Sequence, residues 1–328
     1  MFVIYINDLD DGMVNWISKN ADDTKVDDVV NNEVGFQSLQ RDLGQLEKWA
    51  ELWQMEFNAA KCEVLHFGRN NPNRTYMVNG RALKNAVEQS DLGIMVHSSL
   101  KVESHVDRVV KKAFGMLAFI NQSIEYRSWD VMLKLYKALV RPNLEYCVQF
   151  WSPNYRKDVN KIERVERRFT RMLPGFQHLS YRERLNKLGL YSLEYRRLRG
   201  DLIEVFKIMR GIDRVDVDRL FPSRVGEIQT RGHELRVRGQ KFKGNMRWNF
   251  FTRRVVAVWN KLPVEVVEAS LALSFKVKLD RYMDRKGMEG YGLSAGHWDY
   301  ASKRLAWTRR AEVACFRAVI LLYGYMVF

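Results

Sequence analysis

Apolar residues near the start of the chain recur with the period of an α-helix. They lie three or four residues apart: Phe36, Leu39, Leu43, Leu46, Trp49 and Trp53. This spacing gives one apolar helical face and predicts a helix over about residues 34–55. Two short runs before it, 16–20 and 24–30, are expected to pair as the strands of a hairpin, with the helix packed beneath them.

Further short strands are predicted before residue 100. The run 63–67 stops at Gly68, and the run 92–96 is the last of the set. Asn79-Gly80 is the dipeptide best suited to a tight hairpin turn, so we expect 76–78 to pair with 81–83. A helix combined with short antiparallel strands predicts an α+β region.

From about residue 103 the apolar pattern becomes helical. Four stretches show the spacing, within 106–120, 131–139, 159–172 and 198–209. Pro142 suits the first turn of a helix, and Ser180 with Glu183 has the capping-box pattern. Glycine and basic residues interrupt the periodicity near 224–244, where we expect a linker, and four glycines interrupt it again over 287–296.

These patterns divide the 328 residues into four segments. We expect an α+β region over 1–100, a mostly helical region over 101–223 and a C-terminal helical region over 224–285. The tail, 286–328, matches no pattern that we recognise, and we expect it to be unrelated or disordered.

Charge is distributed unevenly along the chain. Residues 1–100 contain nine Lys and Arg against fifteen Asp and Glu, whereas residues 101–328 contain forty-five against twenty-four. Such asymmetry points to a polyanion such as nucleic acid as the partner of the second part, although a basic protein without a specific ligand has the same composition. The 46% hydrophobic fraction excludes a wholly disordered chain.

Compartment and anchoring follow from weaker signals. Three widely spaced cysteines make neither a disulfide framework nor a metal cluster. The apolar stretch 313–328 is shorter than the ~20 residues that span a bilayer, and no signal peptide is apparent. We therefore expect an intracellular protein, cytoplasmic or nuclear, without a membrane partner; no protein partner is evident.

Two adjacent carboxylates, Asp22 and Asp23, lie between the two predicted hairpin strands. Neighbouring side chains on a straight strand point to opposite faces, so both acids converge only if the chain turns there. A turn carrying two carboxylates suits a hard cation such as Mg²⁺, which prefers oxygen ligands. The alternative is an ordinary solvated acidic turn.

Basic residues form a second candidate site. Lys157, Lys161, Arg164, Arg168 and Arg171 recur four or three residues apart and so share one face of a predicted helix. Such a row could follow a phosphate backbone, or it could be only the solvated face of an amphipathic helix. Weaker instances of the same kind are Lys111-Lys112, Arg196-Arg197-x-Arg199 and Arg253-Arg254.

Ala21-Asp22-Asp23-Thr24-Lys25 resembles the catalytic hairpin of reverse transcriptases from non-LTR, LINE-like retrotransposons of the jockey and CR1 types. The resemblance continues in the same order over most of the chain, to about residue 285. The segments that carry it are 49–58, 61–68, 91–96, 139–146, 250–251 and 259–263.

The resemblance implies the C-terminal part of an RNA-directed DNA polymerase: a partial palm, then a helical thumb and a C-terminal region. In the family, two Mg²⁺ ions support template-directed nucleotide addition, and here Asp22 and Asp23 match the metal-binding catalytic pair. Lys61 matches a position where a Lys can protonate the departing pyrophosphate; the alternative is a surface Lys before a strand. The thumb would bind an RNA/DNA template–primer duplex, as the basic row suggests.

Two departures argue against catalysis by this chain. The fingers and the first catalytic Asp of the family would lie upstream of Met1, and Asp8, Asp10 and Asp11 are expected to form a solvated turn rather than replace it. Asn20 also stands where the family usually has an aromatic residue, which we expect to loosen the hairpin. We therefore expect a truncated, inactive polymerase; the alternatives are a retained nucleic-acid-binding module and a polymerase completed by another chain.

Overall fold

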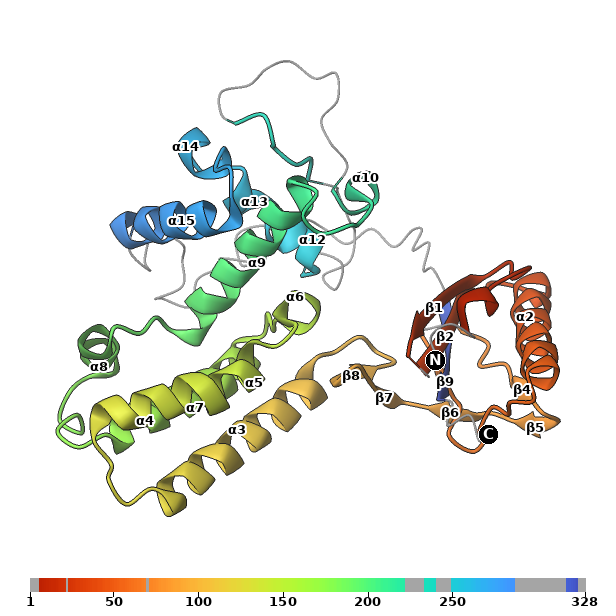
Figure 1. The fold of residues 1–328 in the computed structure, drawn as a ribbon, viewed down its shortest axis with the longest axis horizontal. Helices are drawn as coiled ribbons and strands as arrows, with labels where there is room; N and C mark the ends of the chain where they lie inside the picture. Colours follow the sequence, from red (N-terminus) through yellow and green to blue (C-terminus); the bar gives the residue numbers. More distant parts are fainter. Residues whose placement is uncertain are drawn as a thin grey trace, which may run out of the picture. The chain divides into compact units, whose positions relative to one another are not determined.

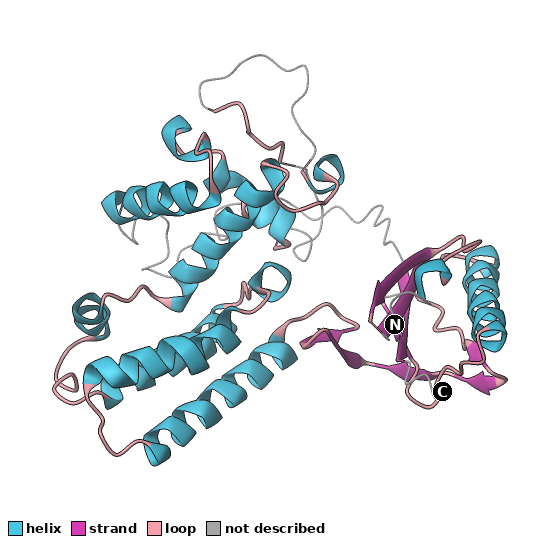
Figure 2. Ribbon diagram, in the orientation of Figure 1, coloured by secondary structure: helices cyan, strands magenta, loops and turns pink. Residues whose placement is uncertain are grey.

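The computed structural model describes residues 6–21, 23–68, 71–221, 233–239, 249–286 and 317–323, the last stretch and Lys286 by their backbone only. The chain divides into two compact units, one of residues 1–104 with 309–328 and the other of residues 105–308. Figure 1 labels the elements, and Figure 2 shows strands in the first unit and helices in both. This content is compatible with the predicted α+β class.

After the short 3-10 helix η1 (Ile6–Asp8), the first unit contains a hairpin packed on a helix, as predicted. Strands β1 (Trp16–Asn20) and β2 (Asp23–Val29) are antiparallel, and helix α2 (Glu33–Leu52) follows them. The Asn32 side chain caps α2 by accepting a hydrogen bond from the backbone N–H of Gly35. The buried face of α2 packs against Val26 of β2; its members are Leu39, Leu43, Leu46 and Ala50.

The first unit contains a five-stranded sheet in the order β1-β2-β9-β3-β6. Strand β9 is antiparallel to both β2 and β3, whereas β3 and β6 are parallel. Residues of the tail therefore form a central strand; the rest of the tail beyond Lys286 lies outside the described residues. The strands not yet given are β3 (Glu63–His66), β6 (Lys84–Ala86) and β9 (Arg317–Tyr323).

Two short hairpins complete the strands of this unit. β4 (Met77–Val78) and β5 (Arg81–Ala82) are joined by Asn79-Gly80, both with positive φ, as the turn dipeptide predicted. β7 (Glu88–Asp91) and β8 (Ile94–His97) form the other. The prediction of a strand over 92–96 was wrong at its start, because Leu92 and Gly93 have positive φ and form the turn.

The helices of the second unit follow the predicted apolar stretches. The first group is α3 (Glu103–Ser123), α4 (Trp129–Leu135), the π-helical turn η2 (Tyr136–Val140), α5 (Arg141–Glu145) and α6 (Val148–Trp151). The second group is α7 (Arg156–Met172), α8 (Tyr181–Leu188), α9 (Leu193–Met209) and α10 (Val217–Leu220). Pro142 lies in the first turn of α5, and Ser180 and Glu183 form the predicted capping box of α8.

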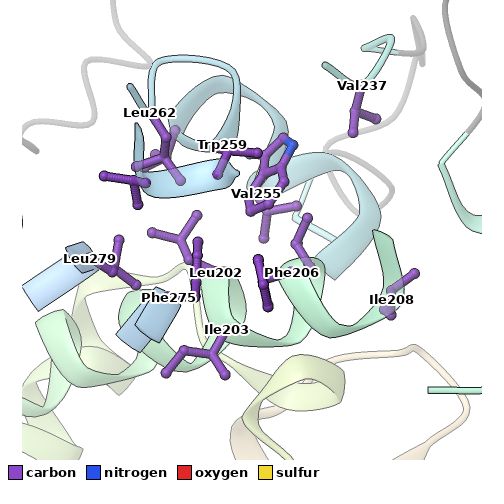
Figure 3. Close-up of a cluster of buried hydrophobic side chains, with 14 of the residues drawn as sticks. Leu202, Ile203, Phe206, Ile208, Val237, Val255, Trp259, Leu262, Phe275 and Leu279 are labelled. Carbon is purple, nitrogen blue, oxygen red and sulfur yellow. The ribbon is translucent and has the colours of Figure 1, made fainter. Parts of the chain in front are cut away.

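Four more helices pack against α9 around one hydrophobic core (Figure 3). They are α12 (Phe251–Arg254), α13 (Val256–Trp259), α14 (Val264–Val267) and α15 (Ala272–Lys286). Phe206 of α9 stacks on Phe275 of α15, with ring centroids 4.2 Å apart. The buried Trp259 ring lies beside them, and its Nε1 donates to the backbone oxygen of Leu235 at 2.7 Å. The described residues of the segment 224–285, which the sequence predicted as a region of its own, therefore share one hydrophobic core with α9.

None of the helices in the described ranges combines the length and the apolar character needed to cross a bilayer.

Candidate acidic hairpin and nucleic-acid interface

The β1–β2 hairpin turns where the sequence places its acidic pair. Asn20 pairs with Asp23 across the two strands, so the turn contains two residues, and Ala21 adopts a left-handed φ of 54°. Asp23 is thus the first residue of β2 and is partly exposed. The predicted ligand Asp22 lies outside the described residues. Asn20 is exposed and paired within the hairpin, so the ring that it replaces would not be buried at this position.

The described carboxylates near the hairpin do not form a metal cage. Asp10 forms an ion pair with a residue of β1, since its Oδ1 lies 2.5 Å from Nζ of Lys19, and this ion pair opposes its charge. The hydrogen bond from Lys19 lowers the pKa of the Asp10 carboxyl. Among the described residues, which do not include Asp22, no group of three or more His, Cys, Asp or Glu side chains is placed to hold a metal ion. These residues therefore do not fit a two-metal centre by themselves.

Lys61 lies at the same end of the sheet as Asp23. Leu321 of β9 pairs with both Lys25 and Glu63, so these two residues are level across the sheet. Asp23 and Lys61 each stand two residues before them, and Lys61 is exposed. One strand separates β2 from β3, which puts their backbones about 9–10 Å apart. The fold thus brings Asp23 and Lys61 to the same end of the sheet.

The predicted basic row is an exposed face of α7. Lys157, Arg164, Arg168 and Arg171 are exposed, and Lys161 is partly exposed. The opposite face of the helix carries the buried Val159, Ile162, Val165 and Phe169. This separation follows from the helical period, which places residues three and four apart on the same side.

The neighbouring helix α3 extends this basic face. Lys161 Nζ lies 2.6 Å from Asp107 Oδ1, which places α3 beside α7. Lys111, one turn after Asp107 on α3, is exposed. On the other side, the Arg167 guanidinium lies over the Tyr181 ring of α8, 4.9 Å from its centroid. We call the row on α7 together with Lys111 the basic surface.

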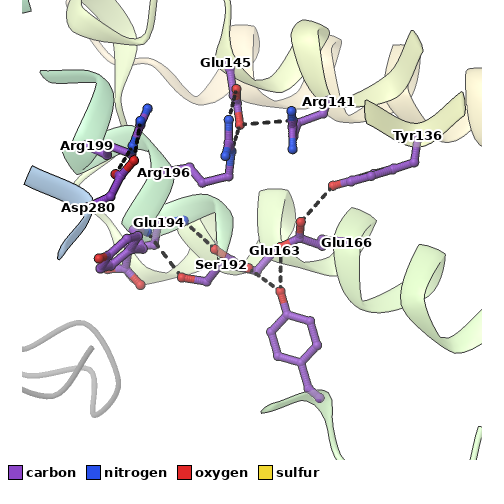
Figure 4. A network of polar contacts seen from close by, with 12 residues as sticks. Tyr136, Arg141, Glu145, Glu163, Glu166, Ser192, Glu194, Arg196, Arg199 and Asp280 are labelled. Carbon is purple, nitrogen blue, oxygen red and sulfur yellow. Dashed lines mark hydrogen bonds and ion pairs between the residues drawn. The ribbon is translucent and has the colours of Figure 1, made fainter. Parts of the chain in front are cut away.

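Other arginines that the sequence suggested as weak nucleic-acid contacts are bound inside the second unit. Arg196 forms a two-point ion pair with Glu145, and Arg199 forms one with Asp280 at 2.5 and 2.8 Å (Figure 4). These two arginines therefore form ion pairs between helices of the second unit and are not available to a ligand.

Arg254 is the most extensively bound of these arginines. Its Nε and Nη2 donate to the two carboxylate oxygens of the buried Asp201, both at 2.9 Å. Nη2 also donates to the backbone oxygens of Val148 and Gln149, and Nη1 to that of Asn249, all at 3.1 Å. Arg254 therefore ties α12 to α6 and α9, a role that a pair of adjacent arginines in a sequence does not reveal.

Sequence reasoning missed a buried polar network beneath the basic row (Figure 4). Glu163 and Glu166 point from α7 into the unit, and the Tyr181 hydroxyl contacts both, at 2.8 and 2.9 Å. Tyr136 donates a further hydrogen bond to Glu166 at 3.1 Å. Burial, followed by the charge of Glu163, raises the pKa of the Glu166 carboxyl to about 8. The only sequence signal was two Glu residues among the apolar positions of an amphipathic helix.

The sequence of this chain is similar to those of two RNA-directed DNA polymerases. It is 28% identical over 144 residues to the RNA-directed DNA polymerase from mobile element jockey of Drosophila funebris. It is 27% identical over 168 residues to the polymerase of the same name from Drosophila melanogaster. These matches support a relationship to a LINE-like reverse transcriptase.

The similarity to the jockey polymerases is partial. The matched stretches cover 42% and 48% of this chain but only 16% and 18% of the two polymerases. An uncharacterised protein of Caenorhabditis elegans is 23% identical over 125 residues, which are 37% of this chain and 63% of that protein. No family profile matches the chain. No solved structure matches it either.

Proposed function

We propose that this chain binds nucleic acid duplexes through the basic surface, in the manner of a polymerase thumb. The observation that carries the proposal is the row Arg164, Arg168 and Arg171, three exposed guanidinium groups that make no ion pair with any described residue. The relationship to RNA-directed DNA polymerases supports an RNA/DNA template–primer duplex as the ligand.

The length of the row suits a duplex. From Lys157 to Arg171 it extends about 21 Å at the helical rise of ~1.5 Å per residue. At ~3.4 Å per phosphate along each strand, this length spans roughly six phosphates. Contacts of this kind give affinity that falls with salt and does not depend on base sequence.

A salt titration tests the proposal. The chain and the triple variant Arg164→Ala, Arg168→Ala, Arg171→Ala are compared for binding to a labelled duplex by fluorescence anisotropy. The slope of log affinity against log salt should become shallower by about 2–3, since each lost phosphate contact contributes ~0.9. The matched control changes three exposed cations elsewhere in the same unit: Lys261→Ala, Arg281→Ala and Arg285→Ala. An unchanged slope in the first variant, or an equal change in the control, contradicts the proposal.

We further propose that the first unit is a polymerase palm that is inactive in this polypeptide. Asp22 and Asp23 would hold Mg²⁺, and Lys61 would supply a proton at the same edge. Bound Mg²⁺ would activate the primer hydroxyl and neutralise the triphosphate. A single pair of carboxylates should bind such a cation weakly, because two nearby cations require more opposing charge.

The second candidate function is template-directed DNA synthesis by this chain with carboxylates supplied by another polypeptide. The position of Asp23 at the start of β2 favours it. Primer extension with Mg²⁺ tests whether this chain catalyses synthesis by itself when the chain is compared with the double variant Asp22→Ala, Asp23→Ala. We expect no incorporation by either protein; incorporation that is lost in the variant would establish catalysis and reject the inactive assignment.

A further inference from the structure

Three exposed aromatic side chains lie at the corner where the chain passes from α5 through α6 into α7. Tyr146, Phe150 and Tyr155 are 57%, 51% and 56% exposed. They occur within ten residues, and Tyr155 occupies the N-cap position directly before α7. We call these three side chains the aromatic corner.

The backbone of this corner is held by a buried neighbour. Trp151, only 1% exposed, donates from Nε1 to the backbone oxygen of Tyr146 at 2.8 Å. The Trp151 ring packs edge-on against His105 of α3, with centroids 4.7 Å apart. The backbone N–H of Phe150 donates to the oxygen of Cys147 at 3.0 Å. The aromatic rings are therefore presented by a well-supported turn.

The electrostatic surroundings of the corner favour a polyanion. Lys157, the first cation of the basic surface, follows Tyr155 by two residues and is exposed. The two carboxylates nearest in sequence do not add free negative charge at this corner, because Glu145 is paired with Arg196 and Asp158 is 1% exposed. An apolar peptide would use the rings alone, whereas a nucleic acid strand uses both the rings and the adjacent cations.

We propose that the aromatic corner stacks on unpaired bases, so that the ligand of this face is nucleic acid in which a single strand leaves the end of a duplex. Rings stack on bases only where the base faces are uncovered, which holds for a single strand and not for the interior of a duplex. α7 would follow the phosphates of the duplex, and the corner at its amino end would receive the strand that leaves it. This inference rests on the proposed binding of duplexes by α7.

Three fluorescent DNA probes test the proposal with the full chain in anisotropy titrations at one salt concentration. The first is a blunt duplex of about 12 base pairs, and the second adds a single-stranded overhang of about six nucleotides, a length within the range bound by stacking sites. The third has the same overhang without bases. The overhang should tighten binding at least about fivefold, and the abasic overhang should not, because a stacked base contributes substantially and a sugar–phosphate chain does not.

Two matched variants locate the effect. Tyr146→Ala, Phe150→Ala, Tyr155→Ala should lose the preference for the overhang and keep its affinity for the blunt duplex. The control Phe119→Ala, Tyr126→Ala, Trp129→Ala removes three other exposed aromatic side chains of the same unit and should keep the preference. Tyr146→Phe with Tyr155→Phe retains the rings and should also keep it. Circular dichroism checks that each variant is folded.

The possible results separate this inference from the proposed function. Binding of the blunt duplex together with an overhang preference that survives in the first triple variant overturns the aromatic corner and leaves α7 as a duplex-binding helix. A preference lost equally in the control triple also overturns it. If the chain does not bind the blunt duplex at all, the proposed function fails; an overhang preference that still depends on the three rings would then support the corner as a separate single-strand site.

Discussion

The Tyr181 hydroxyl lies 2.9 Å from Oε2 of Glu166 and 2.8 Å from Oε2 of Glu163. A phenol carries one hydrogen, so it donates to only one of these carboxyl groups. The other short contact requires a proton on a glutamate. Burial and the neighbouring Glu163 charge place this proton on Glu166, whose pKa is raised to about 8.

The contribution of Glu166 to stability should therefore fall as the pH rises through this range. Glu166 titrates near 4.5 in the unfolded chain and near 8 in the folded one, so between these values only the folded state holds the proton. The contribution of Glu166 to the free energy of unfolding is expected to decrease from pH 4.5 to pH 8, and the difference between the chain and Glu166→Gln in urea titrations measures this contribution. The exposed Glu125→Gln is the control. A slope that persists in Glu166→Gln would place the proton elsewhere.

His105 should give the opposite dependence at lower pH. The side chain is 1% exposed against Trp151, and burial, with a smaller effect of Arg108, lowers its pKa to about 4. Between pH 4 and pH 6.5 the unfolded chain binds the proton that the folded chain excludes, so acidification destabilises the fold. NMR titration should show a neutral ring down to about pH 4. Protonation of the His105 ring at its ordinary pKa of 6.5 would refute the burial argument.

The Arg254–Asp201 pair should be essential to the helical unit. Arg254→Met removes the donor of the buried Asp201 carboxylate and one hydrogen bond to each of three backbone oxygens. Loss of one member of such a buried pair costs about 3–5 kcal/mol. Chemical denaturation followed by circular dichroism measures this loss. Exposed Arg171→Ala should change stability by less than ~0.5 kcal/mol. The double variant Arg254→Met, Asp201→Leu should regain part of the loss, because it removes the uncompensated charge; no recovery would show that the backbone contacts dominate.

Asp107 should limit the affinity of the basic surface. Its carboxylate lies 2.6 Å from Lys161 Nζ and opposes one of the five cations of the row. Asp107→Asn keeps the size of the side chain and removes the charge, so duplex affinity at low salt should increase a few-fold, by ~1 kcal/mol at most for an exposed pair. Asp130→Asn on α4 is the control, because it removes one negative charge from the same unit, as Asp107→Asn does. Weaker binding of Asp107→Asn would mean that the ion pair positions Lys161 for the ligand.

Local patterns predicted most elements because their causes are local. The apolar spacing of Leu39, Leu43 and Leu46 identified α2. Asn79-Gly80 identified the turn of the β4–β5 hairpin, because this dipeptide tolerates positive φ. The row on α7 was predicted for the same reason, since the helical period alone decides which side chains share a face.

Long-range partners could not be read in this way. An arginine can contact a ligand only if the fold does not bring a carboxylate to it. The carboxylate partners of Arg199 and Arg254 are 81 and 53 residues away in the sequence. The insertion of β9 between β2 and β3 likewise depends on hydrogen bonds between segments nearly 300 residues apart.

By itself, the sequence determined the helices, the hairpin with its acidic pair and the exposed basic row, because hydrophobic period and turn chemistry act over a few residues. Only the tertiary structure decided which charges remain available to a ligand. Ion pairing and burial are set by neighbours in space. Arg196, Arg199 and Arg254 are bound to carboxylates of other segments. Arg164, Arg168 and Arg171 remain exposed.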